Sequence, residues 1–253
     1  MLSGCLEESS ISLKYSDPAL VIEGKITNGI GPNYVYISYS SNFNDSISHH
    51  PVSDALVMLS DNQGNSEELE LLEDGIYQSI RIQGTIGNTY RLEVIHDGVT
   101  YEAIDILGPV GQIDSISQRY DEGGVVMEPG YYVTLFAQKS LPDQINYYKW
   151  NLYQGDSLMN GREFLFFGSD EFTNSLNGLE ITHAFEVGDS ITWEIESITR
   201  QVYEYYLQLN IILNNDGIIT HFRNINPPSN FDPPVLGVFQ ASAVSSKSLI
   251  IEE

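Results

Sequence analysis

The single cysteine of the chain, Cys5, has neighbours that suggest a specific chemistry. Leu2, Ser3 and Gly4 precede it, and one branched apolar residue followed by two small residues matches the bacterial lipobox. The lipid-transferring enzyme and the signal peptidase act on a slim, extended segment, which small side chains provide. The pattern predicts a lipoprotein acylated on Cys5, because several acyl chains together anchor a protein stably. The alternative is a short chance match.

Glu7 and Glu8 lie just after this cysteine. They resemble the acidic signal with which Bacteroidota send lipoproteins to the outside of the outer membrane. The alternative is that both acids simply begin a solvated tether. We expect residues 1–18 to comprise the lipobox and this acidic tether. Because no charged and apolar leader regions precede Cys5, we also expect part of a signal peptide to be missing from the sequence.

An aromatic run could supply a binding surface. Tyr147, Tyr148, Trp150 and Tyr153 lie close together in a segment that reads as a strand. Aromatic rings in such a row can stack on a sugar or a peptide. Aromatic rows on strands more often serve core and cross-strand packing, so both interpretations stay open.

Two adjacent histidines are the best candidates for metal ligands. His49 and His50 lie near Asp45 and Asp54 in a polar stretch. Adjacent residues on a strand point to opposite faces, so both histidines can hold one ion only in an irregular loop. A solvated loop is the favoured interpretation, and we expect neither a metal nor another cofactor.

Motifs of catalysis are absent from the sequence. It contains no serine nucleophile elbow, no second cysteine, and no glycine-rich loop of the phosphate-binding or dinucleotide-binding type. Its many carboxylates could in principle form a glycosidase pair, but the sequence singles out none. We predict that the protein is not an enzyme, and a hydrolase whose acids converge only in three dimensions is the remaining alternative.

Charge limits the partners of the chain. Its 35 acidic residues outnumber 11 lysines and arginines, giving a formal net charge of −24. Nucleic acids bind through lysine and arginine contacts to phosphate, so we expect no nucleic-acid partner. Solubility is the favoured explanation of the charge, and attraction of cations or of a basic partner is the alternative.

The elements that must position these residues are mostly strands. Residues 19–107 contain about seven short alternating segments separated by turn signals such as Asp97-Gly98, which predicts a β-sandwich. Beyond Gly108-Pro109, residues 108–253 read as a second β-rich domain. Within it, apolar residues at three- and four-residue steps predict one amphipathic helix near 199–213. The predicted fold class is therefore mostly β.

Two resemblances add to this reading. The stretch that begins PVSDALVMLSD and includes EDGIYQS and GNTYRLEV resembles the prealbumin-like, carboxypeptidase-regulatory type of sandwich, which implies no activity. The segments VIEGKIT, PVSDALV, NYYKW, SITRQVYEYYLQL, NPPSN and LGVFQASAV, in this order, resemble a lipoprotein family of Bacteroidota known as a domain of unknown function, family number 4249. These landmarks cover nearly all of the chain after Cys5, although each alone is degenerate.

The family resemblance implies an outer-membrane lipoprotein that faces the cell exterior. Members are often encoded near TonB-dependent transporters, which implies an accessory role in ligand capture or uptake. The family brings no known catalytic residues, and only the lipobox cysteine is carried over, onto Cys5. We therefore expect a non-catalytic accessory of a TonB-dependent transporter that is lipid-anchored in the outer membrane. The alternative is a structural or adhesive surface protein with no transport role.

Overall fold

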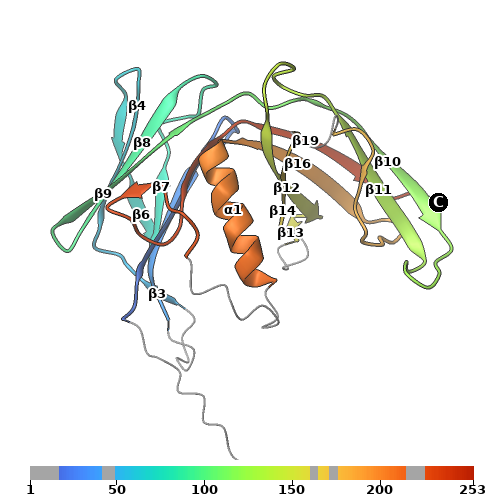
Figure 1. The fold of residues 1–253 in the computed structure, drawn as a ribbon, viewed down its shortest axis with the longest axis horizontal. Coiled ribbons are helices and arrows are strands. Elements are labelled where there is room, and N and C mark those ends of the chain that lie inside the picture. The colour runs from blue at the N-terminus through green and yellow to red at the C-terminus, as the bar shows by residue number, and fades with distance from the viewer. Residues whose placement is uncertain (1–16, 42–48, 160–164, 171–175, 215–225) are drawn as a thin grey trace, which may run out of the picture.

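The computed structural model describes residues 17–41, 49–159, 165–170, 176–214 and 226–253. In this part of the chain, strands β1 to β19 form four sheets and α1 is the one helix. The mostly β fold class predicted from the sequence is confirmed. The sheets are arranged as two sandwiches, which lie at opposite ends of the molecule (Figure 1).

The first sandwich is built from two sheets with a shared apolar core. Its first sheet has the order β18-β1-β2-β7-β6, with β3 added to β2. These strands span Phe239–Ser242, Leu20–Thr27, Asn33–Ser40, Ile76–Ser79, Glu70–Glu73 and His49–Pro51. Its second sheet has the order β17-β9-β8-β4-β5, with bounds Phe231–Asp232, Val99–Ile106, Thr89–His96, Leu56–Asp61 and Ser66–Glu68. Alternation along β1 buries Leu20, Ile22 and Ile26 in the core between these sheets.

The second sandwich is also built from two sheets with a shared apolar core. One sheet has the order β10-β11-β15, spanning Ile113–Asp121, Gly130–Ala137 and Leu179–Glu180. The other has the order β13-β12-β16-β19, with β14 also paired to β12. Its strands span Ser157–Leu158, Tyr147–Gln154, Ser190–Ile198, Val244–Ile250 and Phe166–Ser169. Val133 and Leu135 from the first of these sheets share a core with Leu152 and Ile195 from the second.

The chain visits the first sandwich twice. The boundary expected near residue 108 falls between β9 and β10, where the chain leaves for the second sandwich. Residues 231–242, which the sequence analysis placed with the C-terminal domain, instead return to the first sandwich. There β18 pairs in parallel with β1, and β17 pairs with β9. The physical reason is that Phe231 and Phe239 are buried in the first core.

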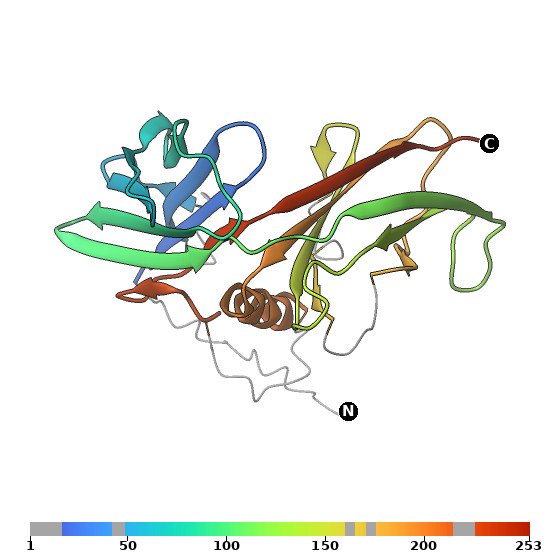
Figure 2. The same ribbon diagram turned by 90° about the horizontal axis from the view of Figure 1, so that it is seen from above.

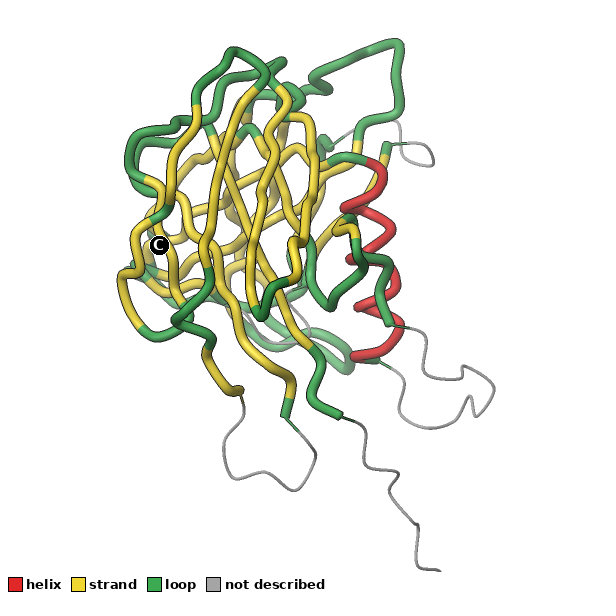
Figure 3. The backbone as a smooth tube through the Cα atoms, turned by 90° about the vertical axis from the view of Figure 1, so that its left-hand side faces the viewer, coloured by secondary structure: helices red, strands yellow, loops and turns green. Residues whose placement is uncertain are grey.

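Helix α1, Arg200–Leu213, occupies the range expected for it and lies between the two sandwiches (Figure 1). Figure 3, seen from the side of the first sandwich, shows the helix running along one edge of the strands. Val202 and Tyr205 are its buried residues and pack with Val238, while Tyr147 of β12 packs against the same cluster. Within the described residues, no helix has the length and apolar character needed to cross a membrane.

The last crossing of the chain, from the first sandwich to the second, is visible from above. In Figure 2 the red C-terminal strand β19 runs the length of the second sandwich, directly after the short β18 of the first. Only Ala243, which is fully buried, separates the two strands. One continuous stretch of backbone therefore joins both sheets, and it fixes how the two sandwiches meet.

Candidate functional site

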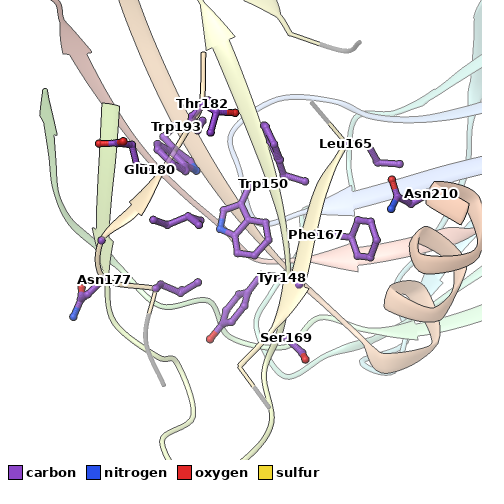
Figure 4. Close-up of a pocket in the computed structure, with 16 residues that line it drawn as sticks. Tyr148, Trp150, Leu165, Phe167, Ser169, Asn177, Glu180, Thr182, Trp193 and Asn210 are labelled. Atoms are coloured by element: carbon purple, nitrogen blue, oxygen red, sulfur yellow. The ribbon is translucent and has the colours of Figure 1, made fainter. Parts of the chain in front are cut away.

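A cavity of about 670 Å³ opens in the second sandwich beside β12. Strands β12, β14 and β16, the segment around β15, and the C-terminal half of α1 contribute to its walls (Figure 4). Its lining is mainly aromatic and aliphatic: Tyr148, Trp150, Leu165, Phe166, Phe167, Gly168, Ser169, Leu176, Asn177, Gly178, Leu179, Glu180, Ile181, Thr182, Trp193 and Asn210. The volume falls within the range of about 300–1,000 Å³ that is usual for small-molecule sites.

Strand β12 divides the four predicted aromatic residues between two faces. Successive side chains of a strand point to opposite sides, so Tyr148 and Trp150 face the cavity while Tyr147 and Tyr153 face away from it. The ring of Tyr147 packs on Tyr203 of α1, with centroids 5.0 Å apart. The hydroxyl of Tyr153 lies 3.5 Å from Oε1 of Glu194. The structure thus brings two of the four together in one site and gives the other two different neighbours.

Trp193 completes the aromatic wall and was not singled out from the sequence. Strand β16 pairs antiparallel with β12, and Leu152 lies opposite Trp193. Trp193 therefore shares a face with Trp150 and is only 1% exposed. The chain contains two tryptophans, and both line this cavity. Figure 4 shows the indole of Trp150 near the centre of the pocket, between Trp193 and Tyr148.

The absence of a side chain at Gly168 makes room for the indole ring of Trp150. Gly168 of β14 lies opposite Tyr148, and Phe166 lies opposite Trp150. A Cβ atom at position 168 would lie 2.8 Å from Cη2 of Trp150, which is closer than van der Waals contact allows. The missing side chain therefore lets the Trp150 ring lie across β14. Gly168 lies inside β14, and a glycine within a strand is a known sign of close approach.

Three polar atoms of the lining residues have no protein partner. The Nε1 atoms of Trp150 and Trp193 and the hydroxyl oxygen of Tyr148 are buried, and none of them makes a hydrogen bond. An indole nitrogen is a donor only, so each needs an acceptor. Most buried polar side-chain atoms in proteins do have a partner, so each exception calls for an explanation. Three such groups lie in the residues around one cavity, so the hydrogen bonds that the protein leaves unmade are concentrated there.

The one carboxylate of the lining is already paired. Arg119 of β10 donates hydrogen bonds to both carboxylate oxygens of Glu180, from Nε to Oε2 at 2.7 Å and from Nη2 to Oε1 at 2.7 Å. These bonds hold the pKa of Glu180 below its ordinary value, so the carboxylate is ionised and paired with the guanidinium, which also binds Asp121 at 2.6 Å. Burial, followed by the charge of Asp170, raises the pKa of Tyr148 to about 12, so its phenol stays protonated. The pocket is thus mainly apolar, with polar groups at a few points.

The histidine pair does not form a site in the described residues. His50 is exposed on β3, where it lies opposite Tyr39 of β2. Asp54 contacts His96 instead, with 3.2 Å between Oδ1 and Nδ1. The side chain of His49 and all of Asp45 lie outside the described residues. Across the part of the chain that is described, no group of three or more His, Cys, Asp or Glu residues could hold a metal ion.

The predicted anchor lies outside the described residues as well. Cys5, Glu7 and Glu8 belong to the segment 1–16, for which the structure gives no placement. The lipid attachment and the export signal therefore stay predictions from the sequence.

These observations define a class of protein: two β-sandwiches with a helix between them, and a ligand-sized aromatic pocket in the second sandwich. The chain belongs to the family described as Domain of unknown function (DUF4249), whose sequence profile matches residues 7–248. The resemblance to the domain-of-unknown-function family with number 4249 is thereby confirmed.

Comparison with curated protein sequences finds no match to this chain. Among solved structures, the adhesin InvE of Yersinia pseudotuberculosis is similar at 16% sequence identity and a TM-score of 0.22. The similarity covers 71% of this chain and 55% of the adhesin, so the chain spans little more than half of that protein's length.

Proposed function

We propose that this chain is a non-catalytic, surface-exposed outer-membrane lipoprotein of Bacteroidota that captures a ligand for a TonB-dependent transporter. The observation that carries the binding role is the aromatic pocket beside β12, with its two unpartnered indole donors. The accessory role in transport follows from the family resemblance of the sequence. The two parts of the proposal are tested separately.

The pocket has the properties of a binding site that exists before its ligand arrives. Its walls come from paired strands, because β12 is hydrogen-bonded to β14 on one edge and to β16 on the other. A site on such strands loses little conformational freedom on binding, which favours affinity. Its mainly apolar lining with a few placed polar groups is typical of ligand pockets.

Binding without turnover is the role that the lining favours. Hydrolysis of a glycosidic bond usually requires two carboxylates flanking the substrate. Among the described lining residues, Glu180 is the one carboxylate, and both of its oxygens are bonded to Arg119. These lining residues include no histidine or cysteine that could act as a base or nucleophile. The arrangement supports capture and release of an unchanged ligand.

The membrane anchor in this proposal is Cys5, and Glu7 and Glu8 direct it to the cell exterior. The motif Leu2-Ser3-Gly4-Cys5 supports the acylation. The net charge of −24 suits a body that stays clear of an anionic lipid surface while its lipid chains hold it there.

The test starts with the native protein, extracted from outer membranes in mild detergent. Mass spectrometry of the purified material should find acyl chains on Cys5 and a stoichiometric TonB-dependent transporter. Deletion of the gene should reduce uptake of that transporter's cargo, and a Cys5→Ala variant should fail to restore it. Recovery of the acylated protein alone, with unchanged uptake after deletion, would overturn the transport role in favour of a structural or adhesive one.

A further inference from the structure

We propose that the pocket beside β12 binds a neutral, mainly apolar ring compound that carries hydrogen-bond acceptor oxygens. This inference deepens the proposed function and rests on its ligand-binding part, not on the transporter. Three features of the pocket determine the three parts of the ligand description: its ring walls, its unpartnered donors and its charge balance.

The ring walls determine the shape. Tyr148 and Trp150 lie side by side, with ring centroids 6.2 Å apart and planes tilted by 34°. Trp193 and Phe166 add further aromatic surface to the same cavity. Flat rings offer a large contact area to another flat ring and prefer offset or edge-on contacts with it. A compact ring system therefore fits this cavity better than a flexible chain does.

The unpartnered donors determine the ligand's polar atoms. The Nε1 atoms of Trp150 and Trp193 are buried donors without an acceptor from the protein, and the hydroxyl of Tyr148 is a third buried group without a partner. A ligand whose carbonyl or ether oxygens reach these groups would satisfy them, whereas a pure hydrocarbon would leave them unpaired. Since the remaining lining is mainly apolar, a sugar would leave many of its hydroxyl groups without partners. This favours a mainly apolar ligand with one or two acceptors.

The charge balance determines the ligand's charge. A cationic ligand would have to compete with Arg119 for the carboxylate of Glu180, because Arg119 already donates two hydrogen bonds to it. An anion would have to approach a chain with a net charge of −24. The aromatic lining provides no free counter-charge to either. A neutral ligand avoids both costs.

The two tryptophans make this inference directly testable. Because Trp150 and Trp193 are the only tryptophans in the chain, the indole region of a ¹⁵N–¹H spectrum contains two resonances, both from the pocket. The probe is 2-acetylnaphthalene, a neutral two-ring ketone, titrated into the purified full-length protein. Matched probes are 2-ethylnaphthalene without the acceptor, naphthalene-2-carboxylate, 2-naphthylmethylammonium and the neutral sugar maltose.

We expect the ketone to shift at least one indole resonance downfield and to bind about tenfold more tightly than 2-ethylnaphthalene, as one good hydrogen bond implies. The variants Trp150→Phe and Trp193→Phe keep a flat ring but lose the donor. At least one should reduce this preference for the ketone without weakening the binding of 2-ethylnaphthalene. Tyr36→Phe, at an exposed ring of the first sandwich, is the control and should change neither.

Three outcomes would overturn the inference. Equal affinity for the two naphthalenes would remove the role of the indole donors. Tighter binding of the carboxylate or the ammonium probe would contradict a neutral ligand, and binding of maltose alone would contradict a mainly apolar one. The wild-type spectrum decides these points even if a variant fails to fold. If the probes fail but a transporter co-purifies, the proposed function stands; if they bind and no transporter is found, only the transport role falls.

Discussion

Glu67 is a buried carboxylate whose role is to hold a turn of backbone. It is 2% exposed and accepts hydrogen bonds from the N–H groups of Ile80, Arg81 and Ile82 and from the hydroxyl of Ser79. Burial by itself would raise its pKa, but these hydrogen bonds outweigh burial and hold the pKa below the ordinary value. The side chain thus ties β5 to the segment that follows β7.

A Glu67→Gln substitution should destabilise the protein by about 2 kcal/mol at pH 7, since an amide cannot accept all of these hydrogen bonds. Because the pKa of Glu67 is lowered in the folded state, its contribution is present above the ordinary pKa of 4.5 and is lost as the pH falls through the folded value. Urea unfolding should therefore show a difference between variant and wild type that shrinks towards pH 3. The exposed neighbour Glu68→Gln is the matched control, and an equal loss from both would contradict this role.

At the scale of elements, the N-cap residue of helix α1 is hydrogen-bonded to a carboxylate of the first sandwich. Thr199 is the N-cap, yet its side chain makes no capping hydrogen bond to the helix. Its hydroxyl instead donates to Asp105 of β9 at 2.8 Å, and the other oxygen of Asp105 accepts the N–H of Ala241 at 2.7 Å. Burial raises the pKa of Asp105 to about 6 despite these hydrogen bonds. One acid therefore joins the helix, β9 and β18.

Asp105 should make the stability of the protein depend on pH between about 4 and 7. The pKa of this carboxyl rises from 3.8 to about 6 on folding, so the protonated group stabilises the folded state below pH 4. This contribution to the free energy of unfolding, about 3 kcal/mol, is lost as the pH rises through 6. Asp105→Asn does not ionise; its amide oxygen accepts the N–H of Ala241, and its NH2 group donates to the hydroxyl oxygen of Thr199. Urea unfolding should show the variant gaining stability relative to wild type as the pH rises from 4 to 8.

The control for this pH dependence is the exposed Asp143→Asn, which should follow the wild type throughout. A constant difference between Asp105→Asn and wild type over the same pH range would show that Asp105 does not titrate on folding in the expected way.

At the scale of the whole molecule, a buried ionic network connects the two sandwiches. Glu196 of β16 is fully buried and accepts hydrogen bonds from Lys25 of β1 at 2.6 Å, Asn151 of β12 at 2.8 Å and Gln240 of β18 at 2.7 Å. Lys149 lies 3.7 Å away. Burial opposes its ionisation, but the two lysines prevail and hold the pKa of Glu196 below its ordinary value. Side chains from both sandwiches thus donate hydrogen bonds to one buried carboxylate.

Removing that charge should weaken the coupling of the sandwiches. Glu196→Gln leaves lysines without their counter-ion and should cost about 3–5 kcal/mol, as expected when a buried pair loses one partner. Both tryptophans lie in the second sandwich, so fluorescence reports on that part and far-UV circular dichroism on the whole. We expect the two urea transitions to coincide in the wild type and to separate in the variant.

The control for the network is a surface ion pair of similar geometry. Arg200 and Glu204 are 2.9 Å apart but largely exposed, so Glu204→Gln should cost less than 1 kcal/mol and keep one transition. The double variant Lys149→Met with Glu196→Leu should recover part of the lost stability, because it removes an unpaired buried charge. A loss below 1 kcal/mol in Glu196→Gln would show that the network does not couple the sandwiches.

Local patterns in the sequence predicted some elements, such as β1 and α1, but not others, such as β19. Alternating residues such as those of VIEGKIT predict a strand because one face must be buried, and β1 has that alternation. The spacing of Val202, Tyr206 and Leu209 predicts the helix for the same reason, at a period of 3.6. The lipobox at Cys5 is likewise a local signal. Each depends only on neighbours along the chain, which a sequence shows directly.

Pairing between distant segments was decided by the tertiary structure alone. Nothing near Phe239 shows that β18 fills the open edge of β1, because several strands of similar composition compete for that edge. The pocket depends on register in the same way: Trp150 and Trp193 share a face because Leu152 lies opposite Trp193. A shift by one residue would turn Trp193 to the other side of the sheet. The sequence thus contained the aromatic residues of the site, and long-range strand pairing chose which of them meet.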